Sequence, residues 1–362
     1  MGAGGAMDEN FQKEYFEIKN EALFAANDWY FSHADELAAS FREALVKSCG
    51  RVAQMQEKGF PAMEYMEITM LRTRLLKGDY RLPVMVYGTD WYADPRQAQA
   101  GEADGSGIFL FYGSLIQQAE GIIKKYRSKL PERMREICMC TEAELFWNYA
   151  YMAGRRAVMG FEPAGAAITD AFRVRVCEYM GYGAVCRRYM PRMKPEELKE
   201  WFGRGPGEDY KYRDYRGYDC SGWDFSGLDL DGCDFSGCVL DGCCFENASL
   251  SGAWLCNSSI KNASFRNAWL TGARFDGSDL EGSVFITAYS ICRVNEDVWR
   301  KPDYHWASFA GCKLKNADFT FTKIAEADFS GADLEGCQFN NAHRTYYEVD
   351  DEQREKAVWN TF

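Results

Sequence analysis

A large apolar side chain stands on every fifth residue over a long stretch of the second half of the chain. These positions run from Phe225 to Phe285 and hold phenylalanine or leucine, with isoleucine only at Ile260. In most repeats a small or thiol side chain lies two residues before the apolar one, and Gly or Asn lies two residues after it. An α-helix has about 3.6 residues per turn and a strand alternates its side chains, so neither has this spacing. The period therefore indicates a repeat architecture.

A five-residue period is satisfied when the chain turns one corner per repeat and keeps the apolar residue inside. Four corners close a square coil of about twenty residues, and such coils stack at the ~4.8 Å spacing of paired strands. Glycine and asparagine suit the corners because they tolerate unusual backbone angles. The repeat resumes in a shifted register between Phe309 and Phe339. The sequence thus predicts a short rod with one interruption.

The repeat also carries a family resemblance. The segments ASFRNAWLTGARFDGSDLEG (263–282) and ADFSGADLEG (327–336) resemble the pentapeptide-repeat family, whose consensus is close to A(D/N)LXX. The resemblance covers about residues 214–343 and implies a right-handed quadrilateral β-helix. It implies a bacterial source and a fold, and only weakly a function.

The first two hundred residues carry no repeat, and their patterns predict a mostly helical α+β domain at 1–200. We expect two helices within 8–58, a β-hairpin at 64–88, a glycine-rich acidic loop at 99–107, and helices at about 108–129, 141–159 and 165–180.

Three further segments complete the predicted organisation. A Gly/Pro-rich linker at 201–213 leads into the rod, and an insertion loop at 288–306 interrupts it. The tail at 344–362 is predicted to form a short helix. Its apolar residues Val358, Trp359 and Phe362 either cap the rod or join two copies as a homodimer.

Composition limits the classes of function. No segment has the run of about eighteen apolar residues that a membrane span needs, and the start of the chain lacks a signal-peptide pattern. We therefore expect a cytoplasmic protein with no membrane partner. Most of the rod's cysteines occupy repeat positions, where a free thiol serves as a small buried apolar group, so neither a metal site nor a cofactor is expected.

The histidine content argues against catalysis. The chain has three histidines, and only His33 lies in the predicted N-terminal domain. A catalytic Ser-His-Asp or Cys-His set there would depend on that one residue. We expect no catalytic residues, and an enzyme in residues 1–200 remains an alternative.

An aromatic surface is the leading candidate site. Trp254 and Trp269 each precede a core residue and so point outward, on adjacent walls of consecutive coils. The insertion leaves the rod just above Trp269 and adds further aromatic and basic residues, namely Trp299, Arg300, Tyr304 and Trp306. Aromatic residues beside basic ones are typical of interaction hot spots. The alternative is that the loop folds down and buries the tryptophans.

An acidic surface is the second candidate. Four aspartates ring the first coil with one on each wall, at Asp219, Asp224, Asp229 and Asp234. Some members of the resembled family mimic DNA and act on type II topoisomerases, which requires carboxylates arranged like phosphates. Lys261, Arg266 and Arg274 interrupt this pattern in the following coils.

These observations favour a non-enzymatic protein–protein interaction module, in which a rigid β-helix presents a binding surface to an unknown protein. The alternatives are a DNA-mimicking modulator of a type II topoisomerase, and an enzyme or ligand-binding domain in residues 1–200 with the rod as an adaptor. The net charge of −12 argues against direct nucleic-acid binding.

Overall fold

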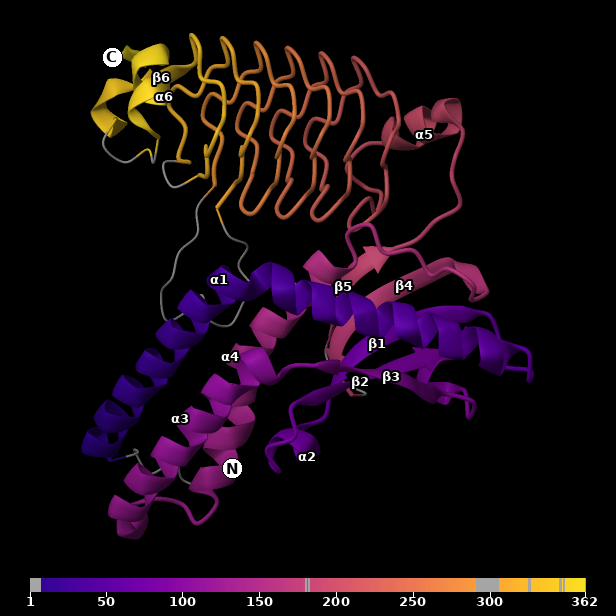
Figure 1. Cartoon of the computed structure of the whole chain (residues 1–362), viewed down its shortest axis with the longest axis vertical. Coiled ribbons are helices and arrows are strands. Elements are labelled where there is room, and N and C mark those ends of the chain that lie inside the picture. The colour runs from indigo at the N-terminus through magenta and orange to yellow at the C-terminus, as the bar shows by residue number, and fades with distance from the viewer. Residues whose placement is uncertain are drawn as a thin grey trace. The chain divides into compact units, whose positions relative to one another are not determined.

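The computed structural model describes residues 8–179, 181, 183–290, 306–324, 327–344, 347 and 349–361. The described chain forms two compact units, one ending at Cys186 and the other beginning at Arg187 (Figure 1). Each unit is described by itself below.

Three long helices pack together in the N-terminal unit: α1 (Glu9–Gln56), α3 (Ser106–Lys125) and α4 (Met134–Ala157). The prediction of two helices within 8–58 is wrong, because α1 runs unbroken through 48 residues. The side chain of Asp8 caps its start by accepting from the amides of Asn10 and Phe11, and no Gly or Pro follows until Gly50. No helix among the described residues is long and apolar enough to cross a membrane.

A five-stranded mixed sheet completes the unit, which is therefore α+β. The strands lie in the order β3-β2-β1-β4-β5. Their bounds are β1 (Met63–Met70), β2 (Arg81–Tyr87), β3 (Ala98–Asp104), β4 (Ile168–Glu178) and β5 (Gly183–Arg188). β1 pairs antiparallel with β2, which confirms the predicted hairpin, and parallel with β4. A short helix α2 (Arg72–Leu75) and the 3-10 turns η1 (Trp91–Ala93) and η2 (Arg127–Lys129) occupy connections.

Two predicted elements of this unit are wrong. The segment expected as a loop at 99–107 is largely strand β3, because α1 packs directly on it. A Cβ added at Gly101 would lie 2.3 Å from the Ser48 hydroxyl. The segment expected as a helix at 165–180 is strand β4, in which Arg173 and Arg175 alternate with buried Val174 and Val176. That alternation is the period of a strand.

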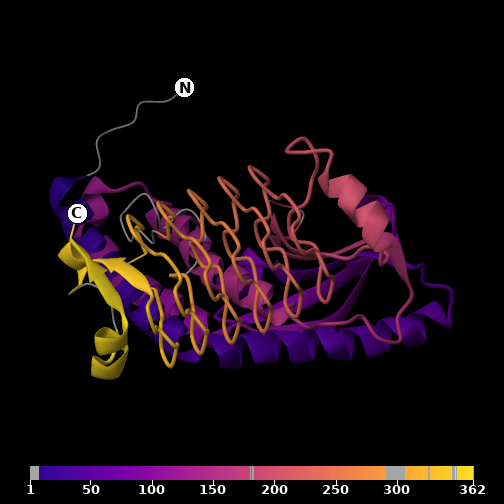
Figure 2. The same cartoon turned by 90° about the horizontal axis from the view of Figure 1, so that it is seen from above.

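The C-terminal unit is a β-helix whose coils stack evenly (Figure 2). Parallel bridges join residues twenty apart, from Asp214 with Asp234 to Trp269 with Tyr289. Each coil thus has four five-residue sides. The apolar residues fill the interior, where Phe265 stacks between Phe245 and Phe285 at centroid distances of 4.9 and 4.7 Å. The corners hold left-handed backbone, as at Gly272 (φ 69°) and Asn267 (φ 56°).

The first coil is closed by large side chains. Tyr218, Trp223 and Leu228 are buried where later repeats have small residues. Helix α5 (Pro195–Phe202) ends over this coil, with Phe202 5.0 Å from the Tyr210 ring. That residues 201–213 link two separate domains stays a prediction. Phe202 and Tyr210, which lie within this segment, are buried in the core of the C-terminal unit.

The tail covers the last coil. Strand β7 (Val358–Asn360) pairs with β6 (Gln338–Asn340), and the Trp359 ring stacks on Phe339 at 5.2 Å. Between them lie the 3-10 turn η4 (Asn341–His343) and helix α6 (Asp351–Lys356). Of the predicted contact residues, Val358 is exposed and Phe362 lies outside the described residues.

Candidate interaction surface of the β-helix

The outward residue before each core residue forms a column with its equivalents in neighbouring coils. Backbone bridges order one such column, which we call the aromatic wall: Asp229, Ser249, Trp269, Tyr289 and Lys323. Amides and carbonyls of neighbouring coils hold it in place. The Trp269 amide donates to Ala248 at 3.0 Å, and the Leu270 amide donates to Tyr289 at 2.7 Å. The wall is therefore a fixed surface, unlike a loop.

The centre of the aromatic wall is exposed to solvent. Trp269 retains 52% of its accessible surface, and its ring stacks on Tyr289 at a centroid distance of 5.3 Å and an interplanar angle of 25°. The Lys323 ammonium lies 5.4 Å from the centroid of the Tyr289 ring. An aromatic pair followed by a cation thus runs along three successive coils.

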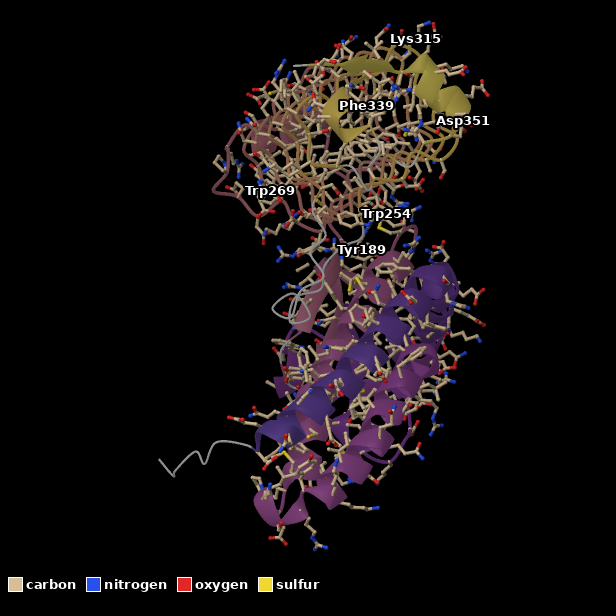
Figure 3. All side chains as sticks on the ribbon, turned by 90° about the vertical axis from the view of Figure 1, so that its left-hand side faces the viewer. Tyr189, Trp254, Trp269, Lys315, Phe339 and Asp351 are labelled. Carbon is tan, nitrogen blue, oxygen red and sulfur yellow. The ribbon has the colours of Figure 1, made fainter. Side chains whose placement is uncertain are left out.

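The predicted aromatic patch is divided by the coil geometry. Trp254 lies on the neighbouring wall, half-buried, with the Arg274 guanidinium 5.2 Å from its ring. Arg274 in turn donates to Asp276. Figure 3 shows Trp254 and Trp269 on different sides of the coil. Trp306 is half-buried, and the other three predicted residues, Trp299, Arg300 and Tyr304, lie outside the described residues.

One exposed aromatic residue was missed at the sequence level. Phe321 keeps 49% of its surface and stands on the corner that leads to Lys323, with a φ of 57°. Most corners carry Gly or Asn at this position, which adopt positive φ readily. A phenylalanine at a corner position was the available signal, because a bulky residue with positive φ is a genuine outlier.

The ring of four aspartates is only partly available to a partner. Asp219 and Asp224 are exposed, whereas Asp229 pairs with Lys211 at 2.5 Å. Asp234 is buried and pairs with Arg187 at 3.0 Å. The expectation of an outward Asp234 is wrong, because the strand that precedes the β-helix brings Arg187 onto it.

Arg187 is itself fully buried and forms the centre of a charged cluster. It lies 2.5 Å from Asp214, which also accepts from Arg216 at 2.6 Å. Burial opposes ionisation of Asp214, but the hydrogen bond from Arg216 and the charge of Arg187 outweigh it and lower the pKa of Asp214 to about 2. A buried guanidinium is tolerated here because two carboxylates face it.

The repeat itself matches a known family model. The model described as Pentapeptide repeats matches residues 219–253, 248–285 and 305–341 with eight copies. Residues 219–341 belong to the pentapeptide-repeat family. No curated protein matches the chain.

Several solved pentapeptide-repeat structures are similar to this chain. One is QnrB1, a plasmid-mediated fluoroquinolone resistance protein, at 22% identity, covering 43% of this chain and 72% of that one, with a TM-score of 0.18. Rfr23 from the cyanobacterium Cyanothece 51142 has 15% identity, 42% and 87% coverage and a TM-score of 0.15. HetL from Nostoc sp. strain PCC 7120, involved in heterocyst differentiation regulation, has 16% identity, 41% and 73% coverage and a TM-score of 0.14.

The cysteines of the pentapeptide-repeat region pack against backbone. The thiols of Cys238 and Cys243 donate to the carbonyls of Tyr215 and Cys220 at 2.9 and 3.0 Å. Burial raises the pKa of each thiol to about 12, so neither is a ready thiolate. Within the described residues, no group of three or more His, Cys, Asp or Glu side chains is arranged to hold a metal ion.

Proposed function

We propose that the pentapeptide-repeat β-helix is a protein–protein interaction module and that the aromatic wall is its contact surface. The observation that carries this proposal is the exposed Trp269 stacked on Tyr289 in a hydrogen-bonded column. Tryptophan and tyrosine are enriched among the residues that contribute most to binding energy.

The rigidity of the wall supports the proposal. Association is opposed by the entropy of ordering side chains and loops. The Trp269 and Tyr289 rings already stack on each other, and their backbone is bonded to the coils on either side. A partner would therefore order little of this surface on binding, and the exposed indole would contribute most of its area directly.

The charges on the wall indicate the chemistry of the partner. Lys323 ends the aromatic column, while the acid at the other end, Asp229, is neutralised by Lys211. A protein segment with an apolar or aromatic side chain for Trp269 and a carboxylate for Lys323 would complement it. The four-aspartate ring supports DNA mimicry less, since Asp234 is buried.

We also infer the handedness of the β-helix and the cellular compartment of the protein. The family resemblance implies a right-handed quadrilateral β-helix, which would act as an adaptor attached to the N-terminal unit. The thirteen cysteines among the described residues are free thiols, which supports a reducing, cytoplasmic setting.

Capture from a bacterial lysate by immobilised wild-type chain, Trp269→Ala and Trp254→Ala tests the proposal. Trp254 is the matched control, because it is a tryptophan at the same repeat position on the neighbouring wall, covered by Arg274. We expect a protein that the wild type and Trp254→Ala retain and that Trp269→Ala loses at least tenfold, about 1.4 kcal/mol. Equal retention by all three chains would refute the aromatic wall as the contact surface.

A further inference from the structure

The N-terminal unit carries a second cluster on the sheet face that points away from helix α4. A Cβ added at Gly154 of α4 would meet Val176 at 2.3 Å, so Val176 and its neighbour Ile68 face the helices. Side chains alternate along a strand, so the residues that flank Ile68 in β1 and Val176 in β4 face the opposite side of the sheet. This opposite face, which we call the open face, carries Tyr65, Glu67, Tyr87, Arg173 and Arg175.

Glu67 is the centre of the open face. It has no exposed surface, and both of its carboxylate oxygens accept hydrogen bonds. Oε1 accepts from Arg175 at 2.6 Å and from the Trp91 indole at 3.0 Å. Oε2 accepts from the Tyr92 hydroxyl at 2.9 Å and from the Cys177 thiol at 3.2 Å. A buried carboxylate on a central strand is costly unless it is fully paired, as it is here.

Two of these donors come from a connection and not from the sheet. Residues 88–97, which we call the strap, join β2 to β3 and contain η1. The Trp91 indole stacks on Tyr65 at 4.9 Å and 10°, and on Tyr92 at 4.4 Å and 22°. The Arg175 guanidinium lies 4.7 Å from the same indole. The strap thus places a planar N–H donor in a slot formed by an aromatic ring, a cation and a carboxylate.

The strap holds this position with backbone strain. Trp91 has a φ of 48°, in the left-handed region that bulky residues rarely adopt. Strained residues persist only where surrounding contacts fix them, and they cluster at functional sites. Here the contacts that fix Trp91 are those to Tyr65, Glu67 and Arg175.

A neighbouring polar group lacks a partner. The Tyr87 hydroxyl is buried, and no hydrogen-bond partner lies within reach among the described residues. Its ring meets Tyr92 edge to face at 5.1 Å, so the hydroxyl belongs to the same cluster. Buried hydroxyls are nearly always paired, so the Tyr87 hydroxyl is a polar group of this cluster that still has hydrogen-bonding capacity.

We propose that Trp91 and Tyr92 occupy a binding slot for a planar heteroaromatic ligand with two adjacent N–H donors, of which the guanine edge is the type. The strap presents two donors to the two oxygens of Glu67, at 3.0 and 2.9 Å. The ring N–H and exocyclic amine of guanine would offer two donors from one ring, where the strap supplies them from two stacked rings, Trp91 and Tyr92. Tyr65 and Arg175 would cover the faces of the guanine ring, as they now cover the indole.

This slot is independent of the aromatic wall, since all of its residues lie in the N-terminal unit. Adenine serves as the discriminating base, because it has no ring N–H beside its amine. A carboxylate recognises two adjacent donors best, since each oxygen accepts one. The proposal therefore predicts base selectivity as well as binding.

Guanosine and adenosine are the probes, and calorimetric titration of the full chain is the test. The double variant Trp91→Ala/Tyr92→Ala removes both strap donors from Glu67, so we expect it to bind guanosine at least tenfold more tightly than wild type does. We also expect it to bind guanosine at least tenfold more tightly than it binds adenosine. Adding Glu67→Gln should abolish that preference, because an amide accepts through one oxygen only. A folded double variant without a preference for guanosine would overturn the proposal, as would a preference that survives Glu67→Gln.

A second measurement covers the case in which the Trp91→Ala/Tyr92→Ala chain does not fold. Hydrogen exchange of the wild-type strap, residues 88–97, should accelerate severalfold in saturating guanosine and remain unchanged in adenosine, because displacement of Trp91 frees the strap. Identical exchange in both nucleosides would contradict the slot.

Discussion

The two units solve the problem of burying polar atoms in opposite ways. In the β-helix each coil repeats one arrangement, and neighbouring coils satisfy one another's backbone groups. In the sheet unit the Glu67 carboxylate is buried beneath a strained Trp91 and is satisfied by side chains that occur there once and are not repeated. The repeated solution spreads stability over many equivalent contacts and leaves its walls free for recognition. The local arrangement makes the burial of Glu67 depend on that one set of donors.

The largest effect is expected in the interior of the β-helix. Phe265→Ala removes a fully buried ring from the phenylalanine stack and should lower the free energy of unfolding of that unit by about 4 kcal/mol. Phe321→Ala is the matched control, because that ring is half exposed, and should change the free energy by only about 0.5 kcal/mol. Urea unfolding of the three chains measures both, and similar losses in the two variants would show that the stack does not carry stability.

A slightly smaller loss is expected at the charged cluster of the sheet unit. Glu67→Ala leaves Arg175 buried without its carboxylate, and should cost about 3 kcal/mol. Glu43→Ala removes an exposed partner of Lys47 on α1 and should leave Tm nearly unchanged. Thermal unfolding compares the two. Equal shifts in Tm would mean that the Glu67 cluster is not decisive for its unit.

Acid should weaken the start of the β-helix through Asp214. The pKa of Asp214 is about 2 in the folded chain, below its ordinary value of 3.8, so the folded state binds fewer protons than the unfolded state between these values. Stability from this group is therefore present above about pH 4 and is lost as the pH falls toward 2, by about 2 kcal/mol. The Asp214→Asn variant is the control, because an asparagine side chain does not titrate in this range. Unfolding at pH 5 and pH 2.5 should show the larger acid loss in the wild type, and parallel losses would exclude the contribution of Asp214.

A smaller effect is expected where the tail covers the last coil. The buried Gln353 amide donates to the carbonyls of Phe329 and Ala332 at 2.8 and 2.9 Å. Gln353→Ala leaves both carbonyls without this donor and should cost about 1.5 kcal/mol. The neighbouring Glu352→Ala removes an exposed ion pair with Lys356 and should be nearly neutral. Hydrogen exchange of residues 327–340 locates the change; uniform exchange across the β-helix would place the tail's role elsewhere.

The repeat could be read from the sequence because every copy meets the same surroundings. Its core positions and corners follow from one rule, and Trp269 is outward because of that rule. Departures from the rule were not predictable in the same way. Asp234 sits at an outward position, yet a residue far before it in the chain, Arg187, covers it.

The N-terminal unit shows why the remainder escaped prediction. Gly101 looked like part of a loop, and only the packing of α1 makes it a strand residue. Glu67 was also missed, although alternating charges were visible in EYMEITM (64–70) and FRVRVCE (172–178). Which strands pair, and hence that Glu67 faces Arg175, depends on contacts between residues 108 apart in the chain. Local pattern does not contain that information.

The most direct test of the aromatic wall is photo-crosslinking from single positions. A benzophenone side chain at position 269 reports on the aromatic wall, and one at position 259 reports on an equivalent outward position of another wall. After irradiation in a bacterial lysate, the account predicts a discrete crosslinked protein from position 269 and none from position 259. Crosslinking of the same protein from both positions, or from neither, would contradict the claim that this β-helix binds its partner through the aromatic wall.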